Sequence, residues 1–184
     1  MRKQEHVLEE YLVMRAQTGE RDAHRQLVAL RGPRLLAHAT RLLGNREEAR
    51  DVVQDGWIEI LRGLRGLREP RAFASWATRI ITRRCARYVD GQIKRRELGE
   101  ALWCEGQIMP DDTAQQDVGE VRAVHAAIAA LPATQSATIA LFYLEEMSVA
   151  EVATALDIPR GTVKTRLMHA RENLRHALKG VTND

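Results

Sequence analysis

The stretch "SVAEVATALDIPRGTVKTRLMHAREN", residues 148–173, contains a helix start, a tight turn and a second, longer helical pattern. Ser148 and Glu151 have the S-x-x-E spacing of a capping box, in which each side chain satisfies a free backbone N–H at the start of a helix. A short turn at Asp157 and Ile158 follows. Asp157 stands where many such turns carry glycine, and aspartate tolerates the left-handed conformation. Two helices joined in this way predict a helix-turn-helix unit.

The second helix of this stretch has one apolar and one polar face. Its apolar seam has helical spacing and consists of Val163, Leu167, Ala170, Leu174 and Leu178. Polar residues at the start of such a helix reach base edges in a DNA major groove, and free N–H groups there favour phosphate. The candidate DNA contacts are Arg160, Gly161, Thr162, Lys164, Thr165, Arg166, His169 and Arg171. A solvated basic face on a helical hairpin is the competing interpretation.

The composition of the chain predicts an all-α fold. Of the 184 residues, 45% are hydrophobic and only 4% aromatic, and glycine and proline rarely interrupt the periodic segments. Helical patterns cover residues 5–17, 20–31, 33–43, 46–64, 72–89 and 121–131, and another helix opens at Pro132. The dipeptide Gly44–Asn45 is a helix-stop signal.

The sequence lacks the signs of a membrane protein, of a metal site and of an enzyme. No apolar run approaches the length of a membrane span, and the start of the chain has no apolar signal-peptide core, so we expect a cytoplasmic protein. Cys85 and Cys104 lack metal-ligand spacing. No nucleophile–base pair or phosphate-binding glycine loop is present. We therefore expect no metal, no cofactor and no catalytic activity.

The helix expected at residues 51–64 has an acidic polar face. Its members are Asp51, Gln54, Asp55 and Glu59. Such a face repels DNA and suits a basic groove on another protein, or simply water. The residues alone favour the solvated face, because charged side chains are mostly exposed.

Charge is segregated in the middle of the chain. Residues 62–96 hold eleven basic residues against the two acids Glu69 and Asp90, whereas residues 97–120 hold seven acids and no lysine or arginine. Arginines recur with helical spacing at Arg79, Arg83 and Arg87, and aromatic residues stand beside them. Arginine with interleaved aromatics can hold phosphates and stack on unpaired bases, or merely solubilise a core helix. The acidic segment is predicted to be a flexible linker.

Three segments in this order resemble the extracytoplasmic-function sigma factors of bacterial RNA polymerase, which belong to the sigma-70 family. They are "DVVQDGWIEIL" (51–61), "FASWATRI" (73–80) and, after the acidic segment, "LPATQSATIALFYLEEMSVAEVATALDIPRGTVKTRLMHARENL" (131–174). The resemblance covers roughly residues 8–178. It implies two helical domains, with a sigma region 2 domain at 1–96, an acidic linker at 97–120 and a sigma region 4 domain at 121–180.

The resemblance also implies roles for individual residues. The helix 51–64 would bind the clamp of core RNA polymerase, formed by its beta and beta-prime subunits, an assignment that the residues alone do not favour. Residues 65–96 would recognise and melt the minus-ten element through Arg68, Arg71, Trp76, Arg79, Arg83 and Arg87. The helix-turn-helix at 148–175 would read the minus-thirty-five element of promoter DNA. The linker would thread the RNA exit path, and an anti-sigma factor would be a further partner.

This chain departs from the family pattern at several positions. Family members usually carry asparagine where Arg83 stands, and an Asp–Arg pair where Arg87 and Asp90 stand. "QDGW" replaces the commoner Gln-Glu-x-Phe, and its glycine, Gly56, lowers helix stability by about 1 kcal/mol relative to alanine. These departures affect the expected minus-ten preference more than the expected binding to polymerase.

The sequence is also compatible with two alternative functions. The chain would act as a sigma-like decoy if it bound an anti-sigma factor without touching DNA, but a decoy needs no basic DNA-binding helix. It would act as a stand-alone helix-turn-helix regulator if it bound DNA without polymerase, but that function leaves the acidic helix and the linker without a purpose.

Overall fold

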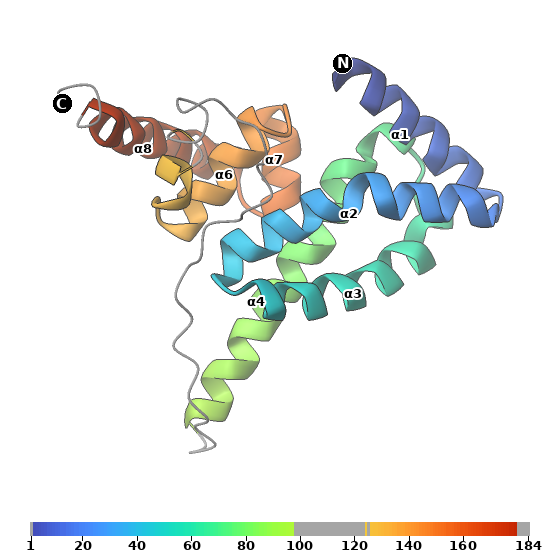
Figure 1. Ribbon diagram of the computed structural model, residues 1–184, viewed down its shortest axis with the longest axis horizontal. Helices are drawn as coiled ribbons and strands as arrows, with labels where there is room; N and C mark the ends of the chain where they lie inside the picture. The colour runs from blue at the N-terminus through green and yellow to red at the C-terminus, as the bar shows by residue number, and fades with distance from the viewer. Residues whose placement is uncertain (1, 98–123, 125, 180–184) are drawn as a thin grey trace.

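The computed structural model describes residues 2–97, 124 and 126–179, and within these the secondary structure is helical, without strands. This confirms the predicted all-α class. Most of the linker predicted at 97–120 lies outside the described residues. The described helices form two units, one from the N-terminal half of the chain and one from the C-terminal half (Figure 1). Each unit has its own hydrophobic core.

The N-terminal unit is a bundle of long helices. Its elements are α1 (Arg2–Gln17), α2 (Arg21–Leu43), α3 (Arg46–Gly63), the 3-10 turns η1 (Leu64–Gly66) and η2 (Pro70–Ala72), and α4 (Phe73–Glu97). Helix α2 contacts α1, α3 and α4 and forms the centre of the bundle. Leu27, Leu35, Ile60, Phe73 and Ile81 are fully buried at the contacts between these helices. The predicted stop at Gly44–Asn45 is confirmed, because Gly44 ends α2 in the left-handed conformation and the Asn45 side chain caps α3.

Two expectations about helix boundaries are wrong. The predicted break between residues 31 and 33 does not occur, and α2 is continuous with Pro33 inside it. A proline removes one backbone hydrogen bond from a helix. Here Leu27, Leu35 and Ala39 form one buried face of α2 on both sides of Pro33, and their burial offsets that loss. Helix α4 also continues past the predicted end at residue 89 to Glu97.

The C-terminal unit contains the helix-turn-helix. Its elements are α6 (Ala133–Tyr143), α7 (Val149–Leu156) and α8 (Arg160–Lys179), and residues 126–129 are also helical. The predicted capping box is present, because Ser148 Oγ accepts from the Glu151 N–H and the Glu151 carboxylate accepts from the Ser148 N–H. Helix α6 contacts both α7 and α8. Buried Val152 and Val163 help to hold α7 and α8 together.

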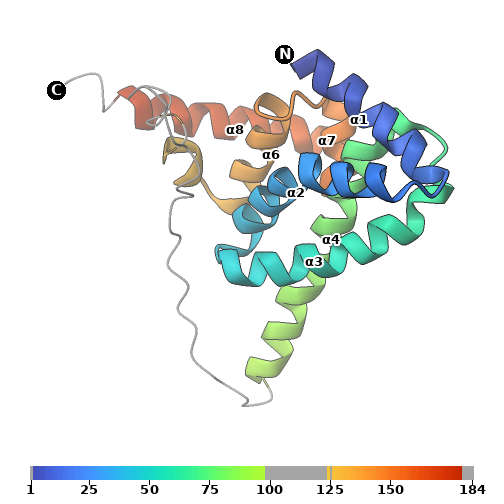
Figure 2. The ribbon, with the colours of Figure 1, turned by 45° about the vertical axis from the view of Figure 1, so that its right-hand side comes forward.

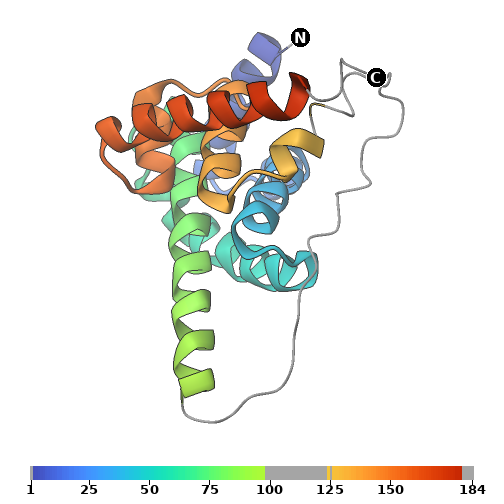
Figure 3. The ribbon, with the colours of Figure 1, turned by 90° about the vertical axis from the view of Figure 1, so that its left-hand side faces the viewer.

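The two units pack against each other. Helix α7 lies on α4, and α6 lies against α2 (Figure 2). The last turns of α4 project away from the other helices, as Figure 3 shows. The two surfaces predicted to bind nucleic acid, on α4 and on the helix-turn-helix, therefore come from units that touch.

Gly56 lies where α3 packs tightly against α4. A Cβ atom at Gly56 would lie 2.2 Å from Ile81 Cδ1, and Ile81 is fully buried. The glycine therefore lets the two helices approach, which is a packing reason for a residue that weakens an isolated helix. Gly91 in α4 has no atom within 4 Å of such a Cβ position.

These two glycines give a matched test of the packing. We expect Gly56→Ala to lower the free energy of unfolding, because overpacking of about 1–3 kcal/mol exceeds the gain of about 1 kcal/mol in helix propensity. Gly91→Ala should instead raise it by up to about 1 kcal/mol. Urea unfolding followed by circular dichroism measures both. Equal stabilisation by the two variants would show that α3 and α4 do not meet at Gly56.

Candidate nucleic-acid interface

The helix-turn-helix presents its predicted DNA-binding face to solvent. Val163, Leu167 and Ala170 are buried against α6 and α7, which fixes the rotation of α8. On the other face, Lys164 and Thr165 are exposed. The remaining candidates comprise the exposed Arg160, Gly161, His169 and Arg171 and the half-buried Thr162 and Arg166. The structure therefore brings the first turns of α8 together as one polar surface.

Arg171 differs from the other candidates on α8. Its Nε donates to the hydroxyl of Tyr143 at 2.9 Å, and its guanidinium lies 5.8 Å from the ring centre of Phe142 and 5.6 Å from that of Tyr143. Cation–π contacts and this hydrogen bond hold the side chain on α6. Arg171 therefore also braces α8 on α6, a role that the sequence did not indicate.

The loop before α4 is held by the N-terminal helix. Gln17 Nε2 donates to the backbone oxygens of Leu64 and Leu67, at 3.0 Å and 2.7 Å. The predicted contacts Arg68 and Arg71 are exposed on this loop, and Arg71 Nε lies 3.4 Å from a carboxylate oxygen of Glu10. The predicted loop at 65–71 thus contains ordered 3-10 turns that present two arginines.

Trp76 is mainly a packing residue in this structure. It is half-buried, its ring centre lies 6.2 Å from that of Phe73, and its indole lies against Gly63. The buried face of α4 consists of Phe73, Ala77, Ile81 and Cys85, so Trp76 lies at the edge of the core. Burial raises the pKa of the Cys85 thiol to about 12, which keeps it protonated and unreactive at neutral pH.

Arg79 and Arg83 of α4 bind the turn of the helix-turn-helix. Arg79 Nη2 lies 2.7 Å from Asp157 Oδ1, and Arg83 Nε lies 3.0 Å from Asp157 Oδ2. The hydrogen bond from Arg83 and the charge of Arg79 lower the pKa of Asp157 against the opposing effect of burial, so its carboxylate stays charged at neutral pH. The two candidate DNA surfaces are thus joined by an ion pair that the sequence did not indicate.

The acidic face of α3 is paired with α4 at one end. Arg84 Nε lies 3.0 Å from Glu59 Oε2, and Arg84 Nη1 lies 3.5 Å from Asp55 Oδ2. Arg87 Nη2 lies 3.7 Å from the same Glu59 oxygen. Exposed pairs of this kind contribute about 0–1 kcal/mol each. The other end of the face, with Asp51 and Gln54, is exposed.

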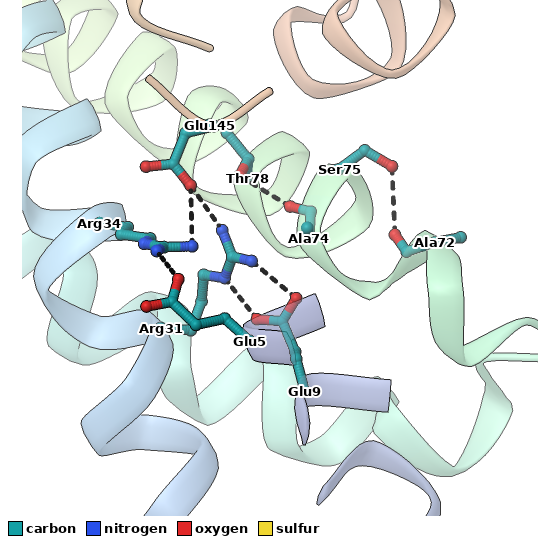
Figure 4. A network of polar contacts seen from close by, with 9 residues as sticks. All are labelled: Glu5, Glu9, Arg31, Arg34, Ala72, Ala74, Ser75, Thr78 and Glu145. Carbon is teal, nitrogen blue, oxygen red and sulfur yellow. Dashed lines mark hydrogen bonds and ion pairs between the residues drawn. The ribbon is translucent and has the colours of Figure 1, made fainter. Parts of the chain in front are cut away.

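A buried ion network joins α1, α2 and the segment after α6 (Figure 4). Arg31 is only 2% exposed, and its Nε and Nη2 each lie 2.6 Å from a carboxylate oxygen of Glu9. Arg31 Nη1 donates to Glu145 at 2.9 Å. Arg34 pairs with Glu5 at 2.6 Å and with Glu145 at 3.6 Å. Sequence reasoning missed this network, although Arg31 stands four residues from both Leu27 and Leu35 on the buried face of α2.

The buried His38 forms a polar contact within the N-terminal unit, and its partner Thr82 extends this contact to the C-terminal unit. Its Nε2 lies 2.9 Å from Thr82 Oγ1 on α4, and that hydroxyl lies 2.7 Å from the carbonyl oxygen of Ala155 on α7. Burial, with a smaller effect from Arg41, lowers the pKa of His38 to about 3. His38 is therefore neutral, and a proton on Nε2 lets it donate to Thr82.

Family comparisons agree with this arrangement of helices. Sigma-70 region 2 matches residues 27–95 and Sigma-70, region 4 matches residues 121–174, so the two matches span well over half of the chain. The ECF RNA polymerase sigma factor SigW of Bacillus subtilis is 28% identical over 180 residues, which cover 91% of this chain and 95% of the relative. The chain is an extracytoplasmic-function sigma factor of the sigma-70 family. Sigma factors act in transcription initiation, and this sigma factor contains both region 2 and region 4 of the family.

Further relatives of this sigma factor match it over nearly its whole length. The RNA polymerase sigma-H factor of Pseudomonas aeruginosa is 28% identical and covers 93% of this chain and 94% of the relative. Among solved structures, the sigma factor RpoE in complex with the anti-sigma factor NepR from Bartonella quintana superposes with a TM-score of 0.63 at 25% identity, over 84% of this chain and 96% of that chain. CnrH in complex with the cytosolic domain of CnrY gives a TM-score of 0.61 at 25% identity, over 94% and 98%.

The described residues of this sigma factor contain neither a candidate membrane span nor a candidate metal site. None of its described helices is both long enough and apolar enough to cross a bilayer. No group of three His, Cys, Asp or Glu side chains among the described residues has the arrangement of a metal site.

The buried His38 predicts an acid-sensitive fold. Its pKa of about 3 in the folded chain is below the ordinary 6.5, so the unfolded chain binds a proton that the folded chain does not. This contribution to stability is complete above about pH 6.5 and decreases on acidification towards about pH 3, by about 1.4 kcal/mol per pH unit. We expect the free energy of unfolding to fall by about 2 kcal/mol between about pH 7.5 and about pH 5.

Urea unfolding at several pH values measures this change. In His38→Gln the same acidification should lower the free energy of unfolding by about 2 kcal/mol less than in the wild type. The control His169→Gln, at an exposed position on α8, should keep the wild-type pH dependence. A wild-type pH dependence in His38→Gln would contradict the assignment.

Proposed function

We propose that this sigma factor consists of three parts and has three binding surfaces. Residues 1–96 form the region 2 domain, residues 97–120 the linker and residues 121–180 the region 4 domain. Helix α3 binds core RNA polymerase, α4 with its preceding loop binds the minus-ten element, and α8 binds the minus-thirty-five element. The observation that carries the proposal is the exposed polar face of α8 opposite a buried seam, next to a second basic helix on the other unit.

Upstream recognition is assigned to the first turns of α8. Arg160 and Lys164 supply positive charge for phosphates, and Thr165 stands one helical turn from Gly161, at whose position no side chain blocks the approach of DNA. Base edges in the major groove are read by residues near the start of such a helix. Thr162, Arg166, His169 and Arg171 complete the assigned surface.

Strand opening is assigned to α4 and the loop before it. Arg68, Arg71, Arg79, Arg83 and Arg87 provide phosphate contacts, and the exposed edge of Trp76 provides a surface for a base. Extruding a base costs a few kcal/mol, which stacking and phosphate contacts offset. No covalent chemistry is needed for this step, so the chain acts without catalytic residues or a cofactor.

Binding to the beta and beta-prime subunits of core RNA polymerase is assigned to the acidic face of α3. Asp51 and Gln54 are exposed, and Asp55 and Glu59 engage arginines of α4 only through partly exposed ion pairs. Weak pairs of this kind exchange readily for a basic partner surface. An anti-sigma factor is a further partner, and a chain that works on promoters belongs in the cytoplasm.

The upstream assignment is tested by charge reversal on α8. We expect Lys164→Glu to abolish promoter-selective transcription, because it places a negative charge against DNA phosphate, and to leave binding to core polymerase unchanged. The matched control is Arg175→Glu, which makes the same charge change at an exposed position further along α8. The measurement is run-off transcription together with a core-binding titration. Equal loss of core binding in Lys164→Glu would overturn the division between the two domains.

The polymerase assignment is tested at the exposed end of the acidic face. We expect Asp51→Lys to weaken binding to core polymerase at least tenfold, since a close like-charge contact in the clamp costs more than about 1.4 kcal/mol. Asp22→Lys reverses an exposed charge on α2 and should bind core as the wild type does. Fluorescence anisotropy with labelled protein measures both affinities. Unchanged binding by Asp51→Lys would show that the acidic face of α3 is a solvated surface and does not contact core polymerase.

A further inference from the structure

We propose that this sigma factor has a self-inhibited closed state, in which the Asp157 carboxylate occupies the place of a DNA phosphate on Arg79 and Arg83 of α4. The proposal rests on the proposed function, because it takes α4 and α8 as the two DNA-binding helices. In the closed state the region 4 turn covers the arginines that would hold the minus-ten strand. Opening then precedes promoter binding.

The contact has the geometry of an arginine–anion site. Two arginines one helical turn apart on α4 place one N–H donor each on the two oxygens of Asp157, at 2.7 Å and 3.0 Å. Between them, Thr82 bonds the backbone oxygen of Ala155, two residues before Asp157. A phosphate bound by the same arginines would need the same donors. The carboxylate and a nucleic-acid strand therefore compete for one site.

The negative charge at this contact comes from Asp157, in the turn of the helix-turn-helix. Asp157 adopts a left-handed backbone conformation with φ of +57°, which favours glycine, asparagine or aspartate. Of these three residues, only aspartate brings a charge to α4.

A second contact joins the two units on the other side of their interface. Glu145, which follows α6, binds Arg31 and Arg34 of α2. When the units separate, Arg31 keeps its bidentate partner Glu9, so the buried charge stays neutralised. The interface can therefore open without leaving an unpaired charge in the core of the N-terminal unit.

The closed state is incompatible with binding both promoter elements. Elements at minus ten and minus thirty-five are separated by roughly 25 base pairs, which is about 85 Å of B-form DNA. Here the turn that begins α8 is hydrogen-bonded to α4. Arg79 Nε is also buried without an acceptor among the described residues, so Asp157 satisfies this arginine only in part. A strand with several phosphates provides more acceptors than the single carboxylate does.

Asp157→Asn is the direct test, because asparagine keeps the shape and tolerates the left-handed conformation but removes the charge. Fluorophores on Arg62→Cys and Arg175→Cys in a Cys104→Ser background report the separation of the units by energy transfer, and the buried Cys85 stays unlabelled. We expect lower energy transfer and about three- to tenfold tighter binding of a single-stranded DNA oligonucleotide without polymerase. Added salt should lower energy transfer in the wild type, because exposed pairs are screened.

The control Glu172→Gln removes one negative charge from an exposed position on α8 and should leave both readouts unchanged. A double variant, Arg83→Gln with Asp157→Asn, should show the same energy transfer as Asp157→Asn alone, because the charge with which Arg83 pairs is already absent. Unchanged energy transfer and DNA affinity in Asp157→Asn would overturn the closed state.

Run-off transcription with core polymerase separates failure of this proposal from failure of the proposed function. If wild type and Asp157→Asn both transcribe but show identical energy transfer, the closed state is wrong and the function stands. If Asp157→Asn opens the chain and neither protein transcribes on any promoter offered, the closed contact stands and the assigned DNA surfaces are wrong.

Discussion

Arg31 is a cation in the interior of the protein, and several helices are placed by the need to neutralise it. A buried charge without a partner costs several kcal/mol, so an arginine that is 2% exposed requires carboxylates within reach. Glu9 supplies one from α1, with two bonds of 2.6 Å, and this fixes α1 across α2. Glu145 supplies the other from the C-terminal unit. One side chain therefore links the internal packing of the first unit to the position of the second.

The helix-turn-helix could be predicted from the sequence because its signals are local. The capping box of Ser148 and Glu151 and the seam from Val163 to Ala170 lie within one short stretch and depend on no distant residue. The continuity of α2 through Pro33 could not be predicted in the same way, since it depends on burial against three other helices. Local signals therefore fail where tertiary packing overrides them.

The candidate surfaces were predicted as sets of residues, but their pairing was not. Arg83 and Asp157 are 74 residues apart, and nothing near either one indicates the other. The acidic face of α3 and the arginines of α4 were likewise predicted as separate features, although Arg84 joins them. The pairing of Arg31 was missed as well, although a charged residue in an apolar helical seam is a signal of a buried ion pair. Periodicity identifies faces of helices, and only the folded chain determines which faces meet.

The Thr82 hydroxyl has a consequence for how the two units come apart. Its oxygen lies 2.7 Å from the Ala155 carbonyl across the interface and 3.0 Å from the Thr78 carbonyl in its own helix. One hydroxyl proton serves either acceptor by rotation about a single bond. When α7 leaves, the proton turns inward to Thr78, and α4 exposes no unsatisfied donor. The two units can therefore separate by rotation of the Thr82 hydroxyl, which exchanges one hydrogen bond for another and leaves no donor unpaired.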